Sequence, residues 1–412
     1  MRKIAVVGGG ASGFAAAIAA ARVGGVRVTI YERLQKPLKK LLATGNGRCN
    51  LTNRIAAPDA YRGDARFAAP ALRRFPPEDT LAFFYSMGLC TKTEALGRVY
   101  PLSGQASSVR DVLLEEARRL SVEVVTDCEV TRVRPENGGF LLNEAYRCDA
   151  LVLAVGGSAA PQHGTDGGAF RLLRALGLPV VEPQPALTAL VCRNFPKNVK
   201  GVRCDCGVRL FAGGRLLYET AGEVQFTEYG LSGIPVFSLS RYVPAKQEAV
   251  VALNCVPALS REALLAFLRA AAQNTPQKPA GLLAAGLVPQ ALGDFLLLQS
   301  GIRKDEPVGA LHESRLLRLA KTLQDARFTV ERPRGFDFAQ VTAGGADCAA
   351  FSPETMEAKR YAHLYVCGET LNVDGDCGGY NLQWAWSSGR AAGEAAANAM
   401  KKEGSACCAS GN

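Results

Sequence analysis

At 412 residues, with 48% hydrophobic and 21% charged side chains, the chain exceeds the about 250 to 300 residues that one hydrophobic core supports, so we expect at least two domains. No apolar stretch approaches the roughly 20 residues of a membrane span, and we predict no membrane partner. The formal net charge of +10 indicates anionic ligands, but the basic residues are dispersed, which favours a phosphate-bearing cofactor over nucleic acid.

Cysteine and histidine usage argues against a disulfide framework and against a metal site. The 13 cysteines are odd in number and scattered, which fits reduced thiols, and three histidines are few for metal binding. At the N-terminus, a short apolar run passes directly into glycines, without the cleavage site of a signal peptide. We therefore predict a cytoplasmic protein.

Residues 2–32 predict a strand, a glycine-rich turn, a helix and a second strand. The turn matches G-x-G-x-x-G: Gly8 permits the tight turn, Gly10 lets a pyrophosphate approach, and Gly13 lets the helix lie close to the strand. The second strand ends at Glu32, nineteen residues after Gly13, where a carboxylate can accept hydrogen bonds from ribose hydroxyls. This combination predicts a dinucleotide site; a glycine-rich turn without a ligand is the alternative.

Residues 39–53 combine amides, hydroxyls, glycines and basic groups in one loop. Asn and Thr side chains, with exposed glycine backbone, suit the polar flank of a cofactor, and Arg48 adds a planar set of donors. The alternative is a helix terminus followed by a polar turn. Cys49 is either redox-active or, as we favour, a small packed side chain.

Between residues 54 and 182, helix and strand patterns alternate as a parallel sheet requires. We predict helices at 78–87, 108–120 and 169–176, and strands at 122–125 and 130–133. The strand at 148–155 is almost wholly apolar and ends at Gly156 and Gly157, where a second backbone segment can approach the cofactor.

From residue 183 the pattern changes to strands without helices, at 187–191, 206–211, 216–219 and 223–226, which predicts a β insertion. The loop 226–235 either faces a substrate or is an ordinary glycine-rich turn. We predict helices at 261–272, with Ser260 as the N-cap, at 289–298 and at 314–323. We interpret these helices as a lid.

The C-terminal part returns to the cofactor. A core strand at 362–367 ends at Gly368 and Glu369, and a loop precedes the helix at 382–400. Residues 378–383, at the start of that helix, would aim amide donors and the positive end of the helix dipole at a ligand over the sheet. Such donors stabilise the negative charge that a reduced flavin carries at N1 and O2.

Five blocks of this sequence, residues 8–13, 44–53, 97–101, 230–233 and 379–383, together resemble the BaiN-like NAD(P)/FAD-dependent oxidoreductases. The resemblance implies an α/β fold, namely a discontinuous FAD-binding Rossmann domain of the glutathione-reductase type with inserted β-barrel-like and helical subdomains. The domain boundaries that we predict are 1–185 and 331–404 for the FAD domain, 186–256 for the barrel, 257–330 for the helices and 405–412 for a flexible tail.

The resemblance also implies how FAD would lie, with adenosine near Glu32 and Val130, pyrophosphate over residues 10–13, and the flavin toward 46–50 and 378–382. The predicted FAD-binding residues are Gly8, Gly10, Ala11, Ser12, Gly13, Glu32, Arg33, Lys40, Thr44, Gly45, Asn46, Arg48, Cys49, Asn50, Leu51, Val130, Ala154, Gly156, Gly157, Gly368, Glu369, Asp374, Gly378, Gly379, Asn381 and Leu382.

Because no second G-x-G-x-x-G unit follows residue 32, NAD(P)H would bind transiently. We predict hydride transfer from NAD(P)H to flavin N5, and then to a conjugated carbon–carbon double bond of a small molecule such as a steroid-like or bile-acid-like enone. Candidate proton donors are Tyr100, Tyr380 and Glu228, the last only if burial raises its pKa. The alternatives are an amine or aminoacetone-type oxidase that uses O2, and a non-enzymatic FAD protein. The sequence does not report the oligomeric state.

Overall fold

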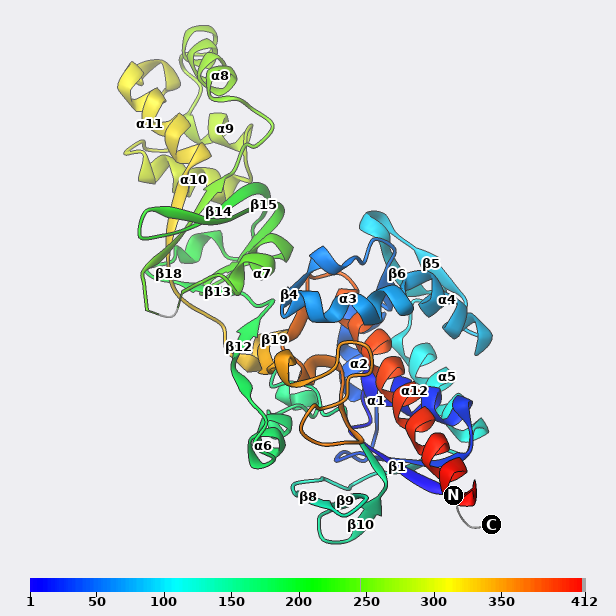
Figure 1. Ribbon diagram of the computed structural model, residues 1–412. Coiled ribbons are helices and arrows are strands. Elements are labelled where there is room, and N and C mark those ends of the chain that lie inside the picture. Colours follow the sequence, from blue (N-terminus) through cyan, green and yellow to red (C-terminus); the bar gives the residue numbers. More distant parts are fainter. Residues whose placement is uncertain (245, 410–412) are drawn as a thin grey trace. The chain divides into compact units, whose positions relative to one another are not determined.

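The computed structural model describes residues 1–244 and 246–409, and the chain divides into two compact units. The first unit combines Met1–Pro185 with Gln340–Asn412, and the second is Ala186–Ala339 (Figure 1). The second unit is thus inserted into the first, which is assembled from both ends of the chain. No helix in the described part of the chain is long and apolar enough to cross a membrane.

A five-stranded parallel sheet forms the centre of the first unit. Its strand order is β20 (Leu364–Val366), β11 (Ala150–Leu153), β1 (Arg2–Val7), β2 (Val26–Tyr31) and β7 (Glu123–Val125). The middle strands are apolar and buried because the helices Ala11–Val23 and Tyr380–Ala409 and the antiparallel strands Gly139–Leu142 and Tyr146–Cys148 pack against them. The predicted α/β Rossmann class is confirmed. All five strands run parallel, so their carboxyl ends meet at one edge.

The first and last long helices of this unit, α1 (Ala11–Val23) and α12 (Tyr380–Ala409), pack closely against each other (Figure 1). Small residues make this approach possible. A Cβ added to Gly389 would lie 2.4 Å from the Ser12 carbonyl oxygen, and one added to Gly393 would lie 2.0 Å from that of Ala16. The C-terminal helix is thereby fixed against the glycine turn at the start of the chain.

The remaining elements of the first unit surround this core. They are α2 (Lys39–Ala43), α3 (Ala65–Arg74), α4 (Pro77–Ser86), α5 (Ala106–Arg119), α6 (Gly168–Ala175), β3 (Thr52–Asn53), β4 (Tyr61–Gly63), β5 (Thr91–Thr93), β6 (Arg98–Pro101), β8 (Val133–Glu136), β9 (Gly139–Leu142), β10 (Tyr146–Cys148), β12 (Val180–Ala186), β19 (Val341–Ala346) and β21 (Val373–Gly375). The strand expected at 130–133 is wrong: only Val133 is in a strand, and β8, β9 and β10 form a separate antiparallel sheet.

The second unit contains a closed barrel of six antiparallel strands. In barrel order these are β13 (Leu190–Cys192), β16 (Gly230–Ser232), β15 (Arg215–Phe226), β14 (Arg203–Ala212), β17 (Ala249–Asn254) and β18 (Ala326–Pro333), with helix α7 (Ile234–Ser240) after β16. The strands predicted at 216–219 and 223–226 form one strand, because Gly222, at φ 145°, continues the pairing with β14 instead of making a turn.

Four helices follow β17: α8 (Arg261–Asn274), α9 (Ala280–Ala285), α10 (Gln290–Gln299) and α11 (Glu313–Gln324). The N-cap prediction is confirmed, since the Ser260 hydroxyl accepts from the Ala263 amide at 3.1 Å. The segment 257–330 is not wholly helical, because β18 begins at Ala326 and closes the barrel; the chain re-enters the first unit at Gln340. Of the predicted tail, 405–409 continue α12, and 410–412 lie outside the described residues.

Candidate active site

The glycine-rich turn between β1 and α1 has one position that the protein itself leaves open. A Cβ on Gly8, at φ 107°, would lie 2.4 Å from the Ala154 carbonyl oxygen, and one on Gly13 would lie 1.9 Å from that of Gly8. A Cβ on Gly10, in contrast, would meet no heavy atom of the described residues within 4 Å. Packing therefore requires glycine at Gly8 and Gly13, whereas Gly10 borders free space at the N-terminus of α1, where a pyrophosphate fits.

Glu32 is held at the end of β2 by backbone donors. Its side chain is buried, and its carboxylate accepts from the amides of Gly9 at 2.6 Å and Leu34 at 2.8 Å. These bonds fix the two oxygens beside the glycine turn, and each retains a lone pair for a ribose hydroxyl. The neighbouring Arg33 pairs with Asp166 at 3.0 Å, so its guanidinium lies at the rim of the same region.

The polar loop 44–53 is joined to the start of α12. The Asn53 amide donates to the carbonyl oxygens of Gly378 at 2.9 Å and Leu96 at 3.1 Å, and the Trp386 indole donates to that of Leu51 at 2.9 Å. The Asn381 side chain closes the loop before the helix, accepting from the amide of Gly375 at 2.8 Å and donating to its carbonyl oxygen at 2.9 Å. Two predicted blocks that are more than 300 residues apart in sequence are thus one structural unit.

Asn50 carries a buried acceptor that the described part of the chain does not satisfy. Its side chain is 9% exposed, and its Oδ1 has no hydrogen-bond partner among the described residues. It lies beside Gly379, where an added Cβ would be 2.9 Å from this oxygen. Because a buried unpaired acceptor costs free energy, the site fits a ligand that donates a hydrogen bond here, as the N3–H of a flavin ring can.

A third segment, after β11, joins the same region through Thr342. The Thr342 hydroxyl accepts from the amides of Ser158 at 2.8 Å and Ala159 at 3.0 Å, while its own amide donates to the Glu369 carboxylate at 2.8 Å. Glu369 also pairs with Lys40 at 2.7 Å. Thr342 could not be predicted from the sequence, because a lone threonine in a strand carries no functional pattern.

Two tyrosines that we predicted as proton donors lie in the first unit. Tyr100 is buried beneath Arg48, whose guanidinium carbon is 4.0 Å from the ring centroid and which also pairs with Glu94. Tyr380 is the first residue of α12, and burial raises the pKa of its hydroxyl. A tyrosine hydroxyl with a raised pKa stays protonated at neutral pH, although it is a weaker acid than a free tyrosine.

The other predicted residues of the first unit lie on several elements: Ser12 is in α1, Ala154 follows β11, and Asp374 is in β21. Val130 lies in the loop between β7 and β8. Ser12, Ala154, Gly368, Val130 and Asp374 are buried. Gln383 and Trp384 were absent from the predicted set. Gln383 accepts from the Thr52 hydroxyl, and the Trp384 indole donates to the Gly368 carbonyl oxygen at 3.0 Å. The available signal in the sequence was that a glutamine and a tryptophan stand side by side near the start of an otherwise alanine-rich helix.

Glu228 does not meet the condition under which we expected a proton donor. Its side chain is 64% exposed, and the hydrogen bond from Lys200, at 2.7 Å, holds the pKa of the carboxyl below its usual value. The group is therefore ionised at neutral pH and has no proton to give. We expect Glu228→Gln to leave the pH profile of kcat unchanged at neutral pH; a lost acidic limb would contradict this assignment.

Cys49 is a packed side chain instead of a reactive thiol. It is fully buried, and burial raises the pKa of the thiol to about 12. Only the thiolate reacts with alkylating agents, so we expect iodoacetamide at about pH 8 to leave Cys49 unmodified in the folded protein. Cys90, which is exposed, is the internal control. Peptide mass mapping should find the label on Cys90 and not on Cys49. Equal labelling of both cysteines would show that Cys49 is accessible.

The sequence was compared with known protein families and proteins. The HI0933-like protein Rossmann domain matches residues 2–395. A 3-dehydro-bile acid delta(4,6)-reductase of Clostridium scindens is 39% identical over 96% of this chain and 99% of its own length. A ribosomal RNA dihydrouridine synthase of Escherichia coli is 31% identical over 93% of this chain and 95% of its own length.

Among solved structures, a 3-ketosteroid delta1-dehydrogenase from Sterolibacterium denitrificans covers 97% of this chain and 100% of its own, with a TM-score of 0.49 and 12% identity. This similarity is too low to bear on function. The match over residues 2–395 and the 39% identical relative confirm the resemblance seen in the sequence. The chain therefore belongs to the HI0933-like Rossmann family, as a flavoprotein oxidoreductase that uses FAD.

Proposed function

We propose that the protein reduces a carbon–carbon double bond conjugated to a carbonyl group, with NAD(P)H as the source of electrons. FAD, when bound, supplies hydride transfer through N5. One contact supports this proposal. Asn53 donates a hydrogen bond to the Gly378 carbonyl oxygen at 2.9 Å, and this bond joins the polar loop 44–53 to the start of α12. This arrangement brings the helix N-terminus and the unsatisfied Asn50 acceptor into one site.

The chain's own groups would bind and polarise the cofactor. Amides of the first turn of α12 have no partner within the helix and carry the positive end of its dipole, so they stabilise negative charge beside them. At the opposite end of the site, Gly10 and Glu32 would receive the pyrophosphate and the adenosine ribose. Lys40 and Glu369, paired at 2.7 Å, would line the middle of the site.

The names of two relatives describe the same kind of reaction, and this indicates a substrate class. A 3-dehydro-bile acid delta(4,6)-reductase and a dihydrouridine synthase both saturate a carbon–carbon bond that is conjugated to a carbonyl group. One substrate is a steroid acid and the other is a base in ribosomal RNA. Since the higher identity, 39%, is to the bile-acid enzyme, we propose a steroid-like enone as the substrate and uridine in RNA as the alternative.

Of the three candidates, we propose Tyr380 as the proton donor because it begins α12, beside the predicted flavin site. Burial raises the pKa of its hydroxyl, and the Tyr61 hydroxyl donates to its carbonyl oxygen at 2.9 Å, which helps to fix the residue at the start of α12. We expect Tyr380→Phe to lower kcat with little change in KM and to leave flavin reduction by NAD(P)H intact. Equal kcat values for both proteins would exclude this role.

The test of the proposed function is an anaerobic stopped-flow experiment. The purified holoenzyme is mixed separately with NADH and NADPH, and the visible flavin absorbance is followed. Rapid bleaching supports a reductase; the reduced protein is then mixed with a 3-oxo-4,6-diene steroid or a uridine-containing ribosomal RNA fragment, and reoxidation identifies the acceptor. Absence of bleaching with either nucleotide contradicts the proposal. Bleaching by an amine donor, with rapid reoxidation in air, would instead indicate an oxidase.

A further inference from the structure

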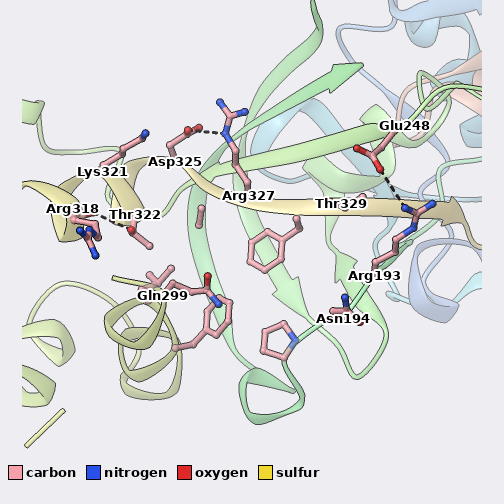
Figure 2. A pocket seen from close by; sticks show the side chains of 15 residues that line it. Arg193, Asn194, Glu248, Gln299, Arg318, Lys321, Thr322, Asp325, Arg327 and Thr329 are labelled. Atoms are coloured by element: carbon pink, nitrogen blue, oxygen red, sulfur yellow. Dashed lines mark hydrogen bonds and ion pairs between the residues drawn. The ribbon is translucent and has the colours of Figure 1, made fainter. Parts of the chain in front are cut away.

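The second unit contains a cavity of about 950 Å³ between the barrel and its helices (Figure 2). Strand β18, helices α10 and α11, and the segment after β13 supply its walls. All of its lining residues belong to the second unit, and none is among the residues predicted to bind FAD. The flavin chemistry therefore leaves this cavity without an assigned role.

Cationic side chains surround the cavity, and two of them lack an acidic partner. Arg193 pairs with Glu248 at 3.3 Å, and Arg327 pairs with Asp325 at 2.8 Å. Arg318 and Lys321 form no ion pair with any described residue, although both line the cavity. Three residues apart on α11, they share one helix face, and Figure 2 shows both on the same side of the cavity. Two adjacent cations without counter-charges are suited to an anion such as a phosphate.

The other lining groups are aromatic rings and amides. Phe295 and Phe328 line the cavity with their ring centroids 6.1 Å apart and their planes at 23°. Phe295 is only half-buried, so part of its ring remains available to a planar ligand. The Asn194 and Gln299 side chains, also labelled in Figure 2, each offer a donor and an acceptor, as recognition of the edge of a base requires.

We propose that this cavity binds a nucleotide, with its phosphate at Arg318 and Lys321 and its base beside Phe295. The predominance of charged and amide side chains in the lining disfavours an apolar ligand such as a sterol. The nucleotide is either free or part of an RNA strand, since both present the same phosphate and base. This site is independent of the flavin reaction proposed above, and the test therefore measures binding.

The test uses the FAD-saturated protein and three probes: AMP, NADP⁺, which cannot reduce the flavin, and a 12-nucleotide single-stranded oligouridine RNA. Binding is measured by calorimetry for the wild type, for the double variant R318A/K321A and for the control R215A/R261A. The control removes the same charge from two exposed residues of the second unit that do not line the cavity. We expect the wild type and the control to bind at least one probe, and R318A/K321A to bind it at least tenfold more weakly, as loss of two charge-assisted hydrogen bonds implies.

The probes distinguish the source of the nucleotide. Binding of RNA alone would identify an RNA strand, and binding of AMP or NADP⁺ as well would identify a free nucleotide. For RNA, the magnitude of the slope of log K against log salt should fall by about 0.7 in R318A/K321A, because both side chains contact one phosphate. The proposal is overturned if no probe binds, if R318A/K321A binds as tightly as the control, or if inorganic phosphate competes as well as AMP does. An unchanged Tm and far-UV circular dichroism spectrum show that R318A/K321A is folded, because flavin bound to the first unit would not report on the second.

Discussion

Gly10→Val is expected to produce a folded protein that has lost its flavin. A Cβ at this position would meet no heavy atom of the described residues within 4 Å, and the backbone, at φ −90° and ψ −170°, is one that valine adopts readily. The added methyl groups would instead occupy the space beside the α1 N-terminus where the pyrophosphate approaches. We expect FAD affinity to fall about 100-fold or more, which corresponds to about 2.7 kcal/mol.

The measurement is the ratio of flavin to protein absorbance after purification, followed by titration of the apoprotein with FAD. Gly335→Val is a matched control, since a Cβ there also meets no described atom within 4 Å and its backbone, at φ −66° and ψ −179°, is extended, but it lies in the second unit. The control should retain flavin. If Gly10→Val binds FAD as tightly as the wild type, the pyrophosphate does not lie over this turn.

The first unit could be predicted well from the sequence where local pattern and chemistry agree. The strand, the glycine turn and α1 follow from apolar periodicity and from glycines whose spacing has few explanations other than a nucleotide turn. Gly13 is fixed by its contact with Gly8 within one short segment, so the local sequence contains that argument, whereas the contact that requires glycine at Gly8 is with the distant Ala154. The loop 44–53 was found because its polar residues have no role in a hydrophobic core.

Contacts between distant segments account for most of what the sequence did not reveal. Barrel closure depends on β18, which pairs with β13 and β17 across a helical stretch, and no local pattern records that pairing. The role of Thr342 depends likewise on amides of Ser158 and Ala159, nearly 200 residues earlier in the chain. For Glu228, the missing information was the neighbouring Lys200, which determines the protonation of the carboxyl.

Gly393→Val is expected to have the largest effect on stability, because it separates two helices that both border the candidate FAD site. A Cβ on Gly393 would lie 2.0 Å from the Ala16 carbonyl oxygen and 2.9 Å from the Ala16 Cα, which are backbone atoms that no side-chain rotation can move. Overpacking of a tight core costs about 3 kcal/mol, and the higher helix propensity of valine than of glycine offsets little of this cost. We expect Tm to fall by about 10 °C.

The control for this variant is Asn398→Val, an exposed position on the same helix, where valine has the same intrinsic helix propensity but no facing backbone. Thermal unfolding of both variants isolates the contribution of the close approach between α1 and α12. Because the first turn of α12 is joined to Leu51 and Asn53, the displaced helix in Gly393→Val should also bind FAD more weakly, whereas Asn398→Val should not. Equal Tm values for the two variants would show that α1 and α12 can move apart without a loss of stability. In that case, packing of the C-terminal helix against α1 would not determine the position of the polar loop.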